Sequence, residues 1–262
     1  MARFCPLFSS SKGNASYLGG ASAGILIDAG VSCRRLLQGL SLCGIEPQSI
    51  RGVFITHEHI DHVRGLAQLT KRFDVPVFGS PGTLERLIEG GFVHPGTRLY
   101  AMQEHPAQIA GMEVRAFPTP HDCAESTGFT VLLPDGRKAS LCTDLGEITD
   151  TVAAHLRGSD FVLLEANYDA ELLRTNPRYP YPLKKRISSR VGHLSNPDSA
   201  AHLRTMVTEG TTRIVLGHLS EENNRPELAA AQVLEALSDM VCGRDFTLDV
   251  APVSTIGKVL TL

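Results

Sequence analysis

The chain has 262 residues, of which 42% are hydrophobic, and a formal net charge of −3. This length and apolar content allow a single domain over residues 1–262 whose core needs no stabilising disulfides. The small negative charge excludes a global attraction to nucleic acid or to an anionic membrane, so any polyanion would have to bind a local basic patch.

The N-terminal stretch MARFCPLFSSSKGN reaches polar residues before an apolar core of signal-peptide length accumulates. No run of 18 apolar residues follows anywhere in the sequence. The six cysteines are scattered without a C-x-x-C pair, which is typical of reduced thiols. We therefore expect a cytoplasmic protein without membrane association, whereas the sequence does not indicate an oligomeric state.

The first third of the sequence predicts a meander of strands that leads into a strand–helix unit. Short apolar runs at 2–8, 15–20 and 23–30 are separated by turn signals such as SSSKGN. Apolar residues at helical spacing predict a helix from Ser32 to Leu42, which Gly44 and Pro47 close. A buried strand, RGVFIT at 51–56, then ends at the polar cluster HEHIDH, residues 57–62.

Helix and strand signals alternate through the rest of the chain. Helices are expected at 63–72, 81–88, 147–157, 196–207 and 224–237. Strands are expected at 75–80, 98–102, 112–117, 128–132, 138–142, 160–167 and 212–218, with two more near the C-terminus. Asn196 and Asn224 fit helix N-caps, since Pro197 follows the first and Glu227 lies three residues after the second. This mixed order suggests two sheets flanked by helices.

The cluster HEHIDH indicates a metal site, because ionised and imidazole side chains are costly to bury unless they are paired or bind a metal. His57 and His59 point the same way on an extended segment, whereas Asp61 and His62 follow the turn toward a helix. Three further ligand-type residues directly follow apolar strands: His121, Asp144 and His218. Loops at strand ends converge into clefts, which favours a shared site over a solvated loop.

The pattern H-x-H-x-D-H resembles the signature of the metallo-β-lactamase fold hydrolases. The resemblance implies an α/β (α+β) protein built as a four-layer αββα sandwich, with two divalent metal ions. It implies this ligand set: His57, His59 and His121 for one ion, Asp61, His62 and His218 for the other, and Asp144 bridging both. Asp61 would also orient the attacking hydroxide. A His/Asp set admits zinc, manganese or iron, and Cys123 and Cys142 are interpreted as small core residues rather than thiolate ligands.

Longer stretches, SSSKGNASYL, YPYPLKKRISSRVGHLSN and VLGHLSEENN, resemble the YycJ (WalJ) subfamily, for which a 5′-to-3′ DNA exonuclease activity is expected. A more distant similarity to ribonuclease Z implies that Glu165 in LLEAN and His193 in GHLSN assist proton transfer. In this role His193 would give a proton to the leaving group. The residues alone leave His193 open as a ligand or a structural histidine, and Glu165 as a partner of some neighbour.

Two segments are candidates for phosphate binding. The SSSKGN loop, with Lys12 and Asn14, could hold a phosphate through backbone N–H groups, or could be a plain turn between strands. Residues 174–190 contain no acid and mix basic side chains with tyrosines, as single-strand binders do, although such runs are usually only solvated. The candidates in this segment are Arg178, Lys184, Lys185, Arg186 and Arg190.

Three functions remain open, because this scaffold supports many reactions. The favoured one is a metal-dependent phosphodiesterase acting on nucleic acid, preferably a DNA exonuclease that uses a hydroxide activated by two metals. The second is a hydrolase of small esters, lactones or thioesters on the same centre, against which the basic segment argues. The third is a non-catalytic nucleic-acid-binding protein stabilised by its metal. Seven ligands for two ions leave room for a water, whereas structural zinc is usually closed by four protein ligands.

Overall fold

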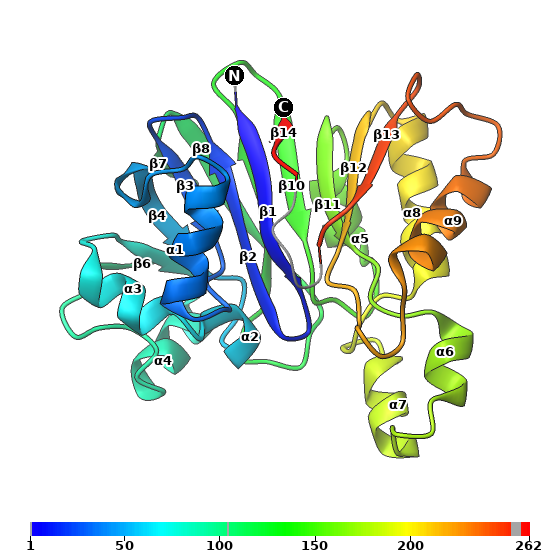
Figure 1. Cartoon of the computed structure of the whole chain (residues 1–262), viewed down its shortest axis with the longest axis horizontal. Coiled ribbons are helices and arrows are strands. Elements are labelled where there is room, and N and C mark those ends of the chain that lie inside the picture. Colours follow the sequence, from blue (N-terminus) through cyan, green and yellow to red (C-terminus); the bar gives the residue numbers. More distant parts are fainter. Residues whose placement is uncertain (1, 104, 253–257) are drawn as a thin grey trace.

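The computed structural model describes residues 2–103, 105–252 and 258–262. The strands form two seven-stranded mixed sheets that face each other, and helices flank them on the outside (Figure 1). This is the αββα sandwich expected from the sequence motif. Among the described residues, no helix has the length and apolar character needed to cross a bilayer.

The first sheet has the order β14-β1-β2-β3-β4-β5-β6. Its strands are β1 (Arg3–Ser10), β2 (Gly13–Gly19), β3 (Gly24–Ile27), β4 (Ile50–Phe54), β5 (Val77–Gly79), β6 (Leu99–Ala101) and β14 (Leu260–Thr261). Strands β3 to β6 run parallel, whereas β14, β1, β2 and β3 pair antiparallel. The helices of this half are α1 (Cys33–Leu42), α2 (Ile60–Val63), α3 (Leu66–Arg72) and α4 (Pro81–Glu89).

The second sheet has the order β13-β12-β11-β10-β9-β8-β7. Its strands are β7 (Ala107–Ile109), β8 (Met112–Pro118), β9 (Thr127–Leu132), β10 (Lys138–Cys142), β11 (Phe161–Glu165), β12 (Arg213–Gly217) and β13 (Thr247–Val250). Strands β10 to β13 are parallel. The helices of this half are α5 (Asp150–Leu156), α6 (Ala170–Thr175), α7 (Tyr181–Ile187), α8 (Asn196–Thr208) and α9 (Pro226–Ala236).

An apolar cluster between the sheets holds them together. Phe4 of the first sheet contacts Phe161 of the second, with ring centroids 4.7 Å apart. Phe54 at the end of β4 meets the edge of Phe129 on β9 at 5.6 Å. Such aromatic contacts stabilise beyond the area they bury, by about 0.5–1.5 kcal/mol per pair. They also fix the ends of β4 and of the second sheet's strands relative to one another.

Two of the predicted helix caps are wrong. Helix α8 is capped by Ser195, whose hydroxyl accepts from the backbone N–H of Asp198, and helix α9 follows Arg225 without a side-chain cap. Asn196 and Asn224 instead donate reciprocally through their side-chain amides, at 2.9 and 2.8 Å. Both amides are buried, and this pairing satisfies groups that would be costly to leave unpaired.

Candidate metal centre

The candidate ligands follow the carboxyl ends of strands from both sheets, so the site spans the two sheets at one edge. His57 follows β4 of the first sheet, whereas His121, Asp144 and His218 follow β8, β10 and β12 of the second. Helix α2, which carries Asp61 and His62, comes directly against the turn at Gly30. A Cβ at this glycine would lie 1.6 Å from the carbonyl oxygen of Asp61, so only glycine permits the approach.

The first ligand group contains His57, His59 and His121, each of which offers a ring nitrogen within 4.8 Å of the others. His57 is fully buried, and burial holds its pKa well below the usual histidine value, helped by the nearby His62. A neutral imidazole is the form that binds a metal. Nδ1 of His121 lies 3.0 Å from the carbonyl oxygen of Gly192, which leaves Nε2 free to face the group.

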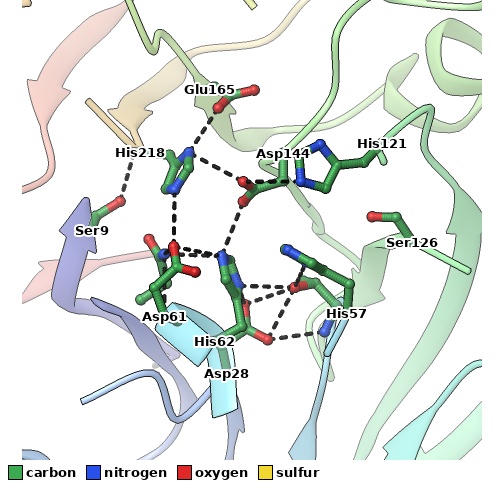
Figure 2. Close-up of polar contacts among 12 residues, drawn as sticks. Ser9, Asp28, His57, Asp61, His62, His121, Ser126, Asp144, Glu165 and His218 are labelled. Atoms are coloured by element: carbon green, nitrogen blue, oxygen red, sulfur yellow. Dashed lines mark hydrogen bonds and ion pairs between the residues drawn. The ribbon is translucent and has the colours of Figure 1, made fainter. Parts of the chain in front are cut away.

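The second group contains Asp61, His62 and His218. Nε2 of His62 and Nε2 of His218 lie 3.6 and 3.7 Å from the same carboxylate oxygen, Oδ2 of Asp61. Figure 2 shows these three side chains facing one another. Imidazole nitrogens and a carboxylate at this spacing form a donor set suited to a divalent ion.

Asp144 lies between the two groups (Figure 2). Its Oδ2 is 3.2 Å from Nε2 of His62, and its Oδ1 is 3.8 Å from Nε2 of His121. Burial alone would raise the pKa of this carboxyl, but the charges of His218 and His62 hold it well below its usual range. A carboxylate that is ionised and turned toward both groups is placed to bridge two cations.

The donor atoms themselves indicate that cations fit. Among the buried side-chain atoms without a hydrogen-bond partner in the described residues are Nε2 of His57, Oδ2 of Asp144 and Nε2 of His218. Leaving such atoms unsatisfied costs about 1–3 kcal/mol each. All three belong to the ligand groups, so metal coordination would satisfy them.

Asp28 was not expected at the site, but it contacts a candidate ligand directly. Its Oδ2 lies 2.8 Å from Nδ1 of His62, and its Oδ1 accepts from the backbone N–H of Thr56 at 2.9 Å. Burial alone would lower the pKa of His62, but the carboxylates of Asp28 and Asp144 raise it well above its usual value. Asp28 therefore orients His62 so that Nε2 faces the other ligands. A signal was present, since Asp28 follows an apolar strand just as several of the candidate ligands do.

Glu165 joins His193 to the centre. Its Oε1 lies 2.8 Å from Nδ1 of His193 and 2.7 Å from Nδ1 of His218. Its Oε2 accepts from the backbone N–H groups of Leu145 and Leu194, at 3.1 and 3.2 Å. Burial raises the pKa of Glu165, but the charge of His193 and its hydrogen bond bring it below the usual value. Glu165 is thus a buried anion, whereas the His193 side chain is 21% exposed.

Three residues of the site adopt the left-handed backbone conformation: Asp28, Asp144 and His218, with φ of 61°, 58° and 54°. This conformation is unfavourable for residues with a Cβ and persists where surrounding contacts enforce it. At His218 the contacts are a hydrogen bond from its N–H to Oγ of Ser9 and one from Nδ2 of Asn167 to its carbonyl oxygen, both 2.8 Å. Neither Ser9 nor Asn167 was expected at the site.

The cysteines next to the ligands do not join them. Neither Cys123 nor Cys142 belongs to a ligand group within the part of the chain that the structure describes. Burial, followed by the charge of Glu58, raises the pKa of Cys123 to about 12. Cys142 lies in the apolar cluster of the second sheet.

The first of the two predicted phosphate-binding segments has its lysine in an ion pair and its asparagine at the candidate metal centre. The SSSKGN segment forms the β1–β2 turn, and Lys12 at its tip pairs with Glu221. Asn14 is buried, with Nδ2 3.0 Å from Nε2 of His62, and so lies among the candidate ligands rather than on the exposed turn.

The basic segment at 174–190 contains the last two residues of α6, all of α7 and the loop before His193, whereas no helix was expected there. All four of its arginines pair with acidic side chains outside the segment: Arg174 with Glu171, Arg178 with Glu222, Arg186 with Asp122 and Arg190 with Glu147. Lys184 donates to the carbonyl oxygen of Arg174 at 2.7 Å. Lys185 has no ion-pair partner among the described residues. Much of the segment's positive charge is therefore already compensated.

Comparison with known proteins finds similar proteins that agree with one another in family and fold. Residues 24–219 match the model of the β-lactamase superfamily domain. The chain is 34% identical over 239 residues to the exodeoxyribonuclease YycJ of Bacillus anthracis, covering 90% of this chain and 89% of the relative. It is 31% identical over 259 residues to the exodeoxyribonuclease WalJ of Streptococcus pneumoniae, covering 95% and 94%. The crystal structure of the metallo-β-lactamase fold protein YhfI of Bacillus subtilis aligns with a TM-score of 0.73 at 12% identity, over 98% of both chains.

Proposed function

The chain belongs to the β-lactamase superfamily, in the family of the YycJ and WalJ proteins, and from this membership we propose that it is a DNA exonuclease. It is a metal-dependent hydrolase, and its relatives support a nuclease or phosphodiesterase. One observation carries the finer proposal: Asp144 lies between the two ligand groups, and His193, whose side chain is 21% exposed, is hydrogen-bonded to Glu165 beside them.

The residues of the centre would hold two divalent ions in the arrangement that the sequence motif implies. His57, His59 and His121 would hold one ion, and Asp61, His62 and His218 the other, with Asp144 between them. Zinc, manganese and iron all accept such imidazole and carboxylate donors. Bound there, two ions would supply Lewis acidity and lower the pKa of a water toward neutrality.

The chain's own residues would then direct the proton transfers. The Asp61 side chain is 18% exposed and faces His62 and His218, so it can accept a hydrogen bond from the attacking water. Cleavage of a phosphodiester expels an alkoxide, which needs a proton. Because Nδ1 of His193 is held by Glu165, its Nε2 is the atom left to donate that proton.

A groove between α6 and α7 would receive part of the strand. Its volume is about 430 Å³, and its walls include Tyr168, Leu173, Arg174, Tyr181, Lys184 and Lys185. The Tyr181 side chain is 76% exposed, which leaves its ring open for stacking by a base. One end of the groove lies near His193, since Ser188 lines the groove and the backbone N–H of His193 donates to the carbonyl oxygen of the adjacent Ile187.

Digestion of end-labelled DNA and RNA by metal-loaded protein tests this function. We expect mononucleotides to accumulate from one end of DNA, with slower or no release from RNA of the same sequence. Labels at the 5′ and at the 3′ end would give the direction of attack. Hydrolysis of esters, lactones or thioesters without release of nucleotides from DNA would contradict the proposal.

A further inference from the structure

Helices α1 and α3 carry positive charge without any negative charge. Residues 32–43 and 63–73, which comprise these helices and their ends, contain no aspartate or glutamate. Their ionisable side chains, apart from Cys33 and Cys43, are Arg34, Arg35, Arg64, Lys71 and Arg72. In a chain whose net charge is −3, this is a local concentration of positive charge.

The two helices enclose a broad groove, which we call the α1–α3 groove. Its volume is about 860 Å³, and its walls include Cys33, Arg34, Leu37, Gln68, Lys71 and Arg72. Arg34, Lys71 and Arg72 are exposed and form no ion pair with the residues that the structure describes. The arginines around α6 and α7 differ in this respect, since several are bound to carboxylates. The α1–α3 groove therefore keeps its charge available to an external anion.

One end of the groove, at Cys33, lies beside Gly65, which follows helix α2 of the candidate metal centre. Backbone hydrogen bonds of 2.8 Å join Ala29, just before α1, to His62 of α2 and to Gly65 at the start of α3. A Cβ at Gly65 would lie 2.2 Å from the carbonyl oxygen of Val31, so the glycine permits this close contact. Helix α3 has seven residues and extends roughly 10 Å from this junction, at about 1.5 Å per residue.

We propose that the α1–α3 groove binds the sugar-phosphate backbone of the substrate strand through Arg34, Lys71 and Arg72. The proposal rests on the proposed nuclease function and adds a second contact surface to it. Helices α1 and α3 lie on one side of α2, whereas α6 and α7 lie on the other (Figure 1). A strand bound across the centre would thus be held on both sides of the bond that is cleaved.

The features of the groove favour a nucleic-acid strand over other anions. Its cations lie on two helices, with Arg34 at the start of α1 and Lys71 and Arg72 at the end of α3, so they could contact more than one phosphate of a strand. Its end at Cys33 adjoins the segment that follows Asp61 and His62, so a strand that continued beyond this end would approach the candidate ligands. An anionic lipid surface would gain nothing from this connection.

Binding of a labelled single-stranded oligonucleotide of about 20 nucleotides with phosphorothioate linkages tests the groove. We compare metal-loaded wild-type protein with the variant Arg34→Gln/Lys71→Gln/Arg72→Gln over a range of salt concentrations. Each lost phosphate contact flattens the logarithmic salt slope by about 0.7 for a single strand, so three should flatten it by about 2. The same relation predicts an affinity loss of roughly 100-fold near 0.1 M salt.

The matched control removes three positive charges elsewhere, in Arg51→Gln/Arg115→Gln/Lys258→Gln, none of which lies on α1, α3, α6 or α7. It should keep the wild-type affinity and slope. Hydrolysis of a nitrophenyl phosphodiester, which is too small to reach the groove, should be the same in all three proteins. The single variant Lys71→Gln should show about a third of the slope change.

If the triple variant bound the oligonucleotide as tightly as the wild type, the proposed role of the groove would be wrong. It would also be wrong if the control variant lost as much oligonucleotide affinity as the triple variant. If the triple variant lost binding to anionic vesicles but kept its oligonucleotide binding, the groove would be a lipid-binding surface instead. Failure of the wild type to hydrolyse nucleic acid would contradict the proposed function. If the wild type hydrolysed DNA and the triple variant bound the oligonucleotide equally well, only the proposed role of the groove would be contradicted.

Discussion

Oε1 of Glu165 lies 2.8 Å from Nδ1 of His193. The same oxygen lies 2.7 Å from Nδ1 of His218, so one buried carboxylate joins the candidate proton donor to a candidate metal ligand. A substitution of Glu165 would therefore disturb both histidines at once and could not separate proton transfer from metal binding. The role of His193 has to be tested on His193 itself.

The variant His193→Ala should hydrolyse DNA about 10²–10⁴ times more slowly, which is the usual contribution of a positioned proton donor. A nitrophenyl phosphodiester should be spared most of this loss, because its leaving group needs no proton. Metal content should stay at the wild-type level. Rates on both substrates, measured beside elemental analysis, check this. Loss of a metal ion, or an equal loss on both substrates, would make His193 a ligand or a structural residue.

The metal-replete protein should contain two divalent ions per chain, about 3.5–4 Å apart. The two ligand groups and the position of Asp144 between them are the reason for this expectation. Elemental analysis gives the number of ions, and anomalous scattering from crystals gives their positions. A single ion under saturating metal would show the two-metal arrangement to be wrong.

The variant Asp61→Asn should lose hydrolysis while keeping its fold. The amide removes the charge that faces His62 and His218 and accepts hydrogen bonds less strongly than the carboxylate. Circular dichroism and thermal unfolding check the fold, and both DNA and nitrophenyl phosphodiester rates check activity. Full activity of Asp61→Asn would show that Asp61 is not needed at the site.

The variant Asp28→Asn should bind metal about 10–100 times more weakly, as expected for a residue that orients a ligand. The charged hydrogen bond to Nδ1 of His62 is weakened, and so is the fixed direction of that ring. Competition with a chelator measures the affinity. The control Asp74→Asn changes a carboxylate that is 92% exposed and should have no effect. If the metal affinity of Asp28→Asn were unchanged, the role of Asp28 would be confined to its hydrogen bonds with Thr56.

The variant Lys184→Glu/Lys185→Glu should weaken binding to all DNA sequences alike and flatten its salt dependence. Arg186 is left unchanged because it pairs with Asp122, the neighbour of His121, and its reversal would disturb the centre. The control Arg98→Glu changes an exposed residue near β6. Affinity measured against salt concentration decides the question. If the slope stays at the wild-type value, the two lysines do not contact the bound strand.

The strand ends and the ligand residues could be predicted because each signal is local. Apolar runs mark β4, β10 and β12, and a ligand-type residue follows each. Asp28 carried the same signal but stood outside the motif that directed attention to the others. The short helices α6 and α7 have six and seven residues, too few for a clear helical period.

The ion pairs of the basic residues could not be predicted, because their partners are distant in sequence. Lys12 and its partner Glu221 are 209 residues apart, and Arg186 and its partner Asp122 are 64 residues apart. Composition therefore showed where positive charge is concentrated but not where it is compensated. The extent of a single domain over residues 1–262 and the metal-binding roles of the ligands stay predictions.

The left-handed backbone at Asp28, Asp144 and His218 has a consequence for laboratory evolution. These are three of the four non-glycine residues with positive φ in the described ranges, 2–103, 105–252 and 258–262. Each costs of the order of 1 kcal/mol or more of folding free energy. A selection for thermal stability alone would therefore favour glycine or asparagine at these positions, and the more heat-resistant proteins it yields would have lost two candidate ligands, Asp144 and His218, or the carboxylate of Asp28 that orients His62.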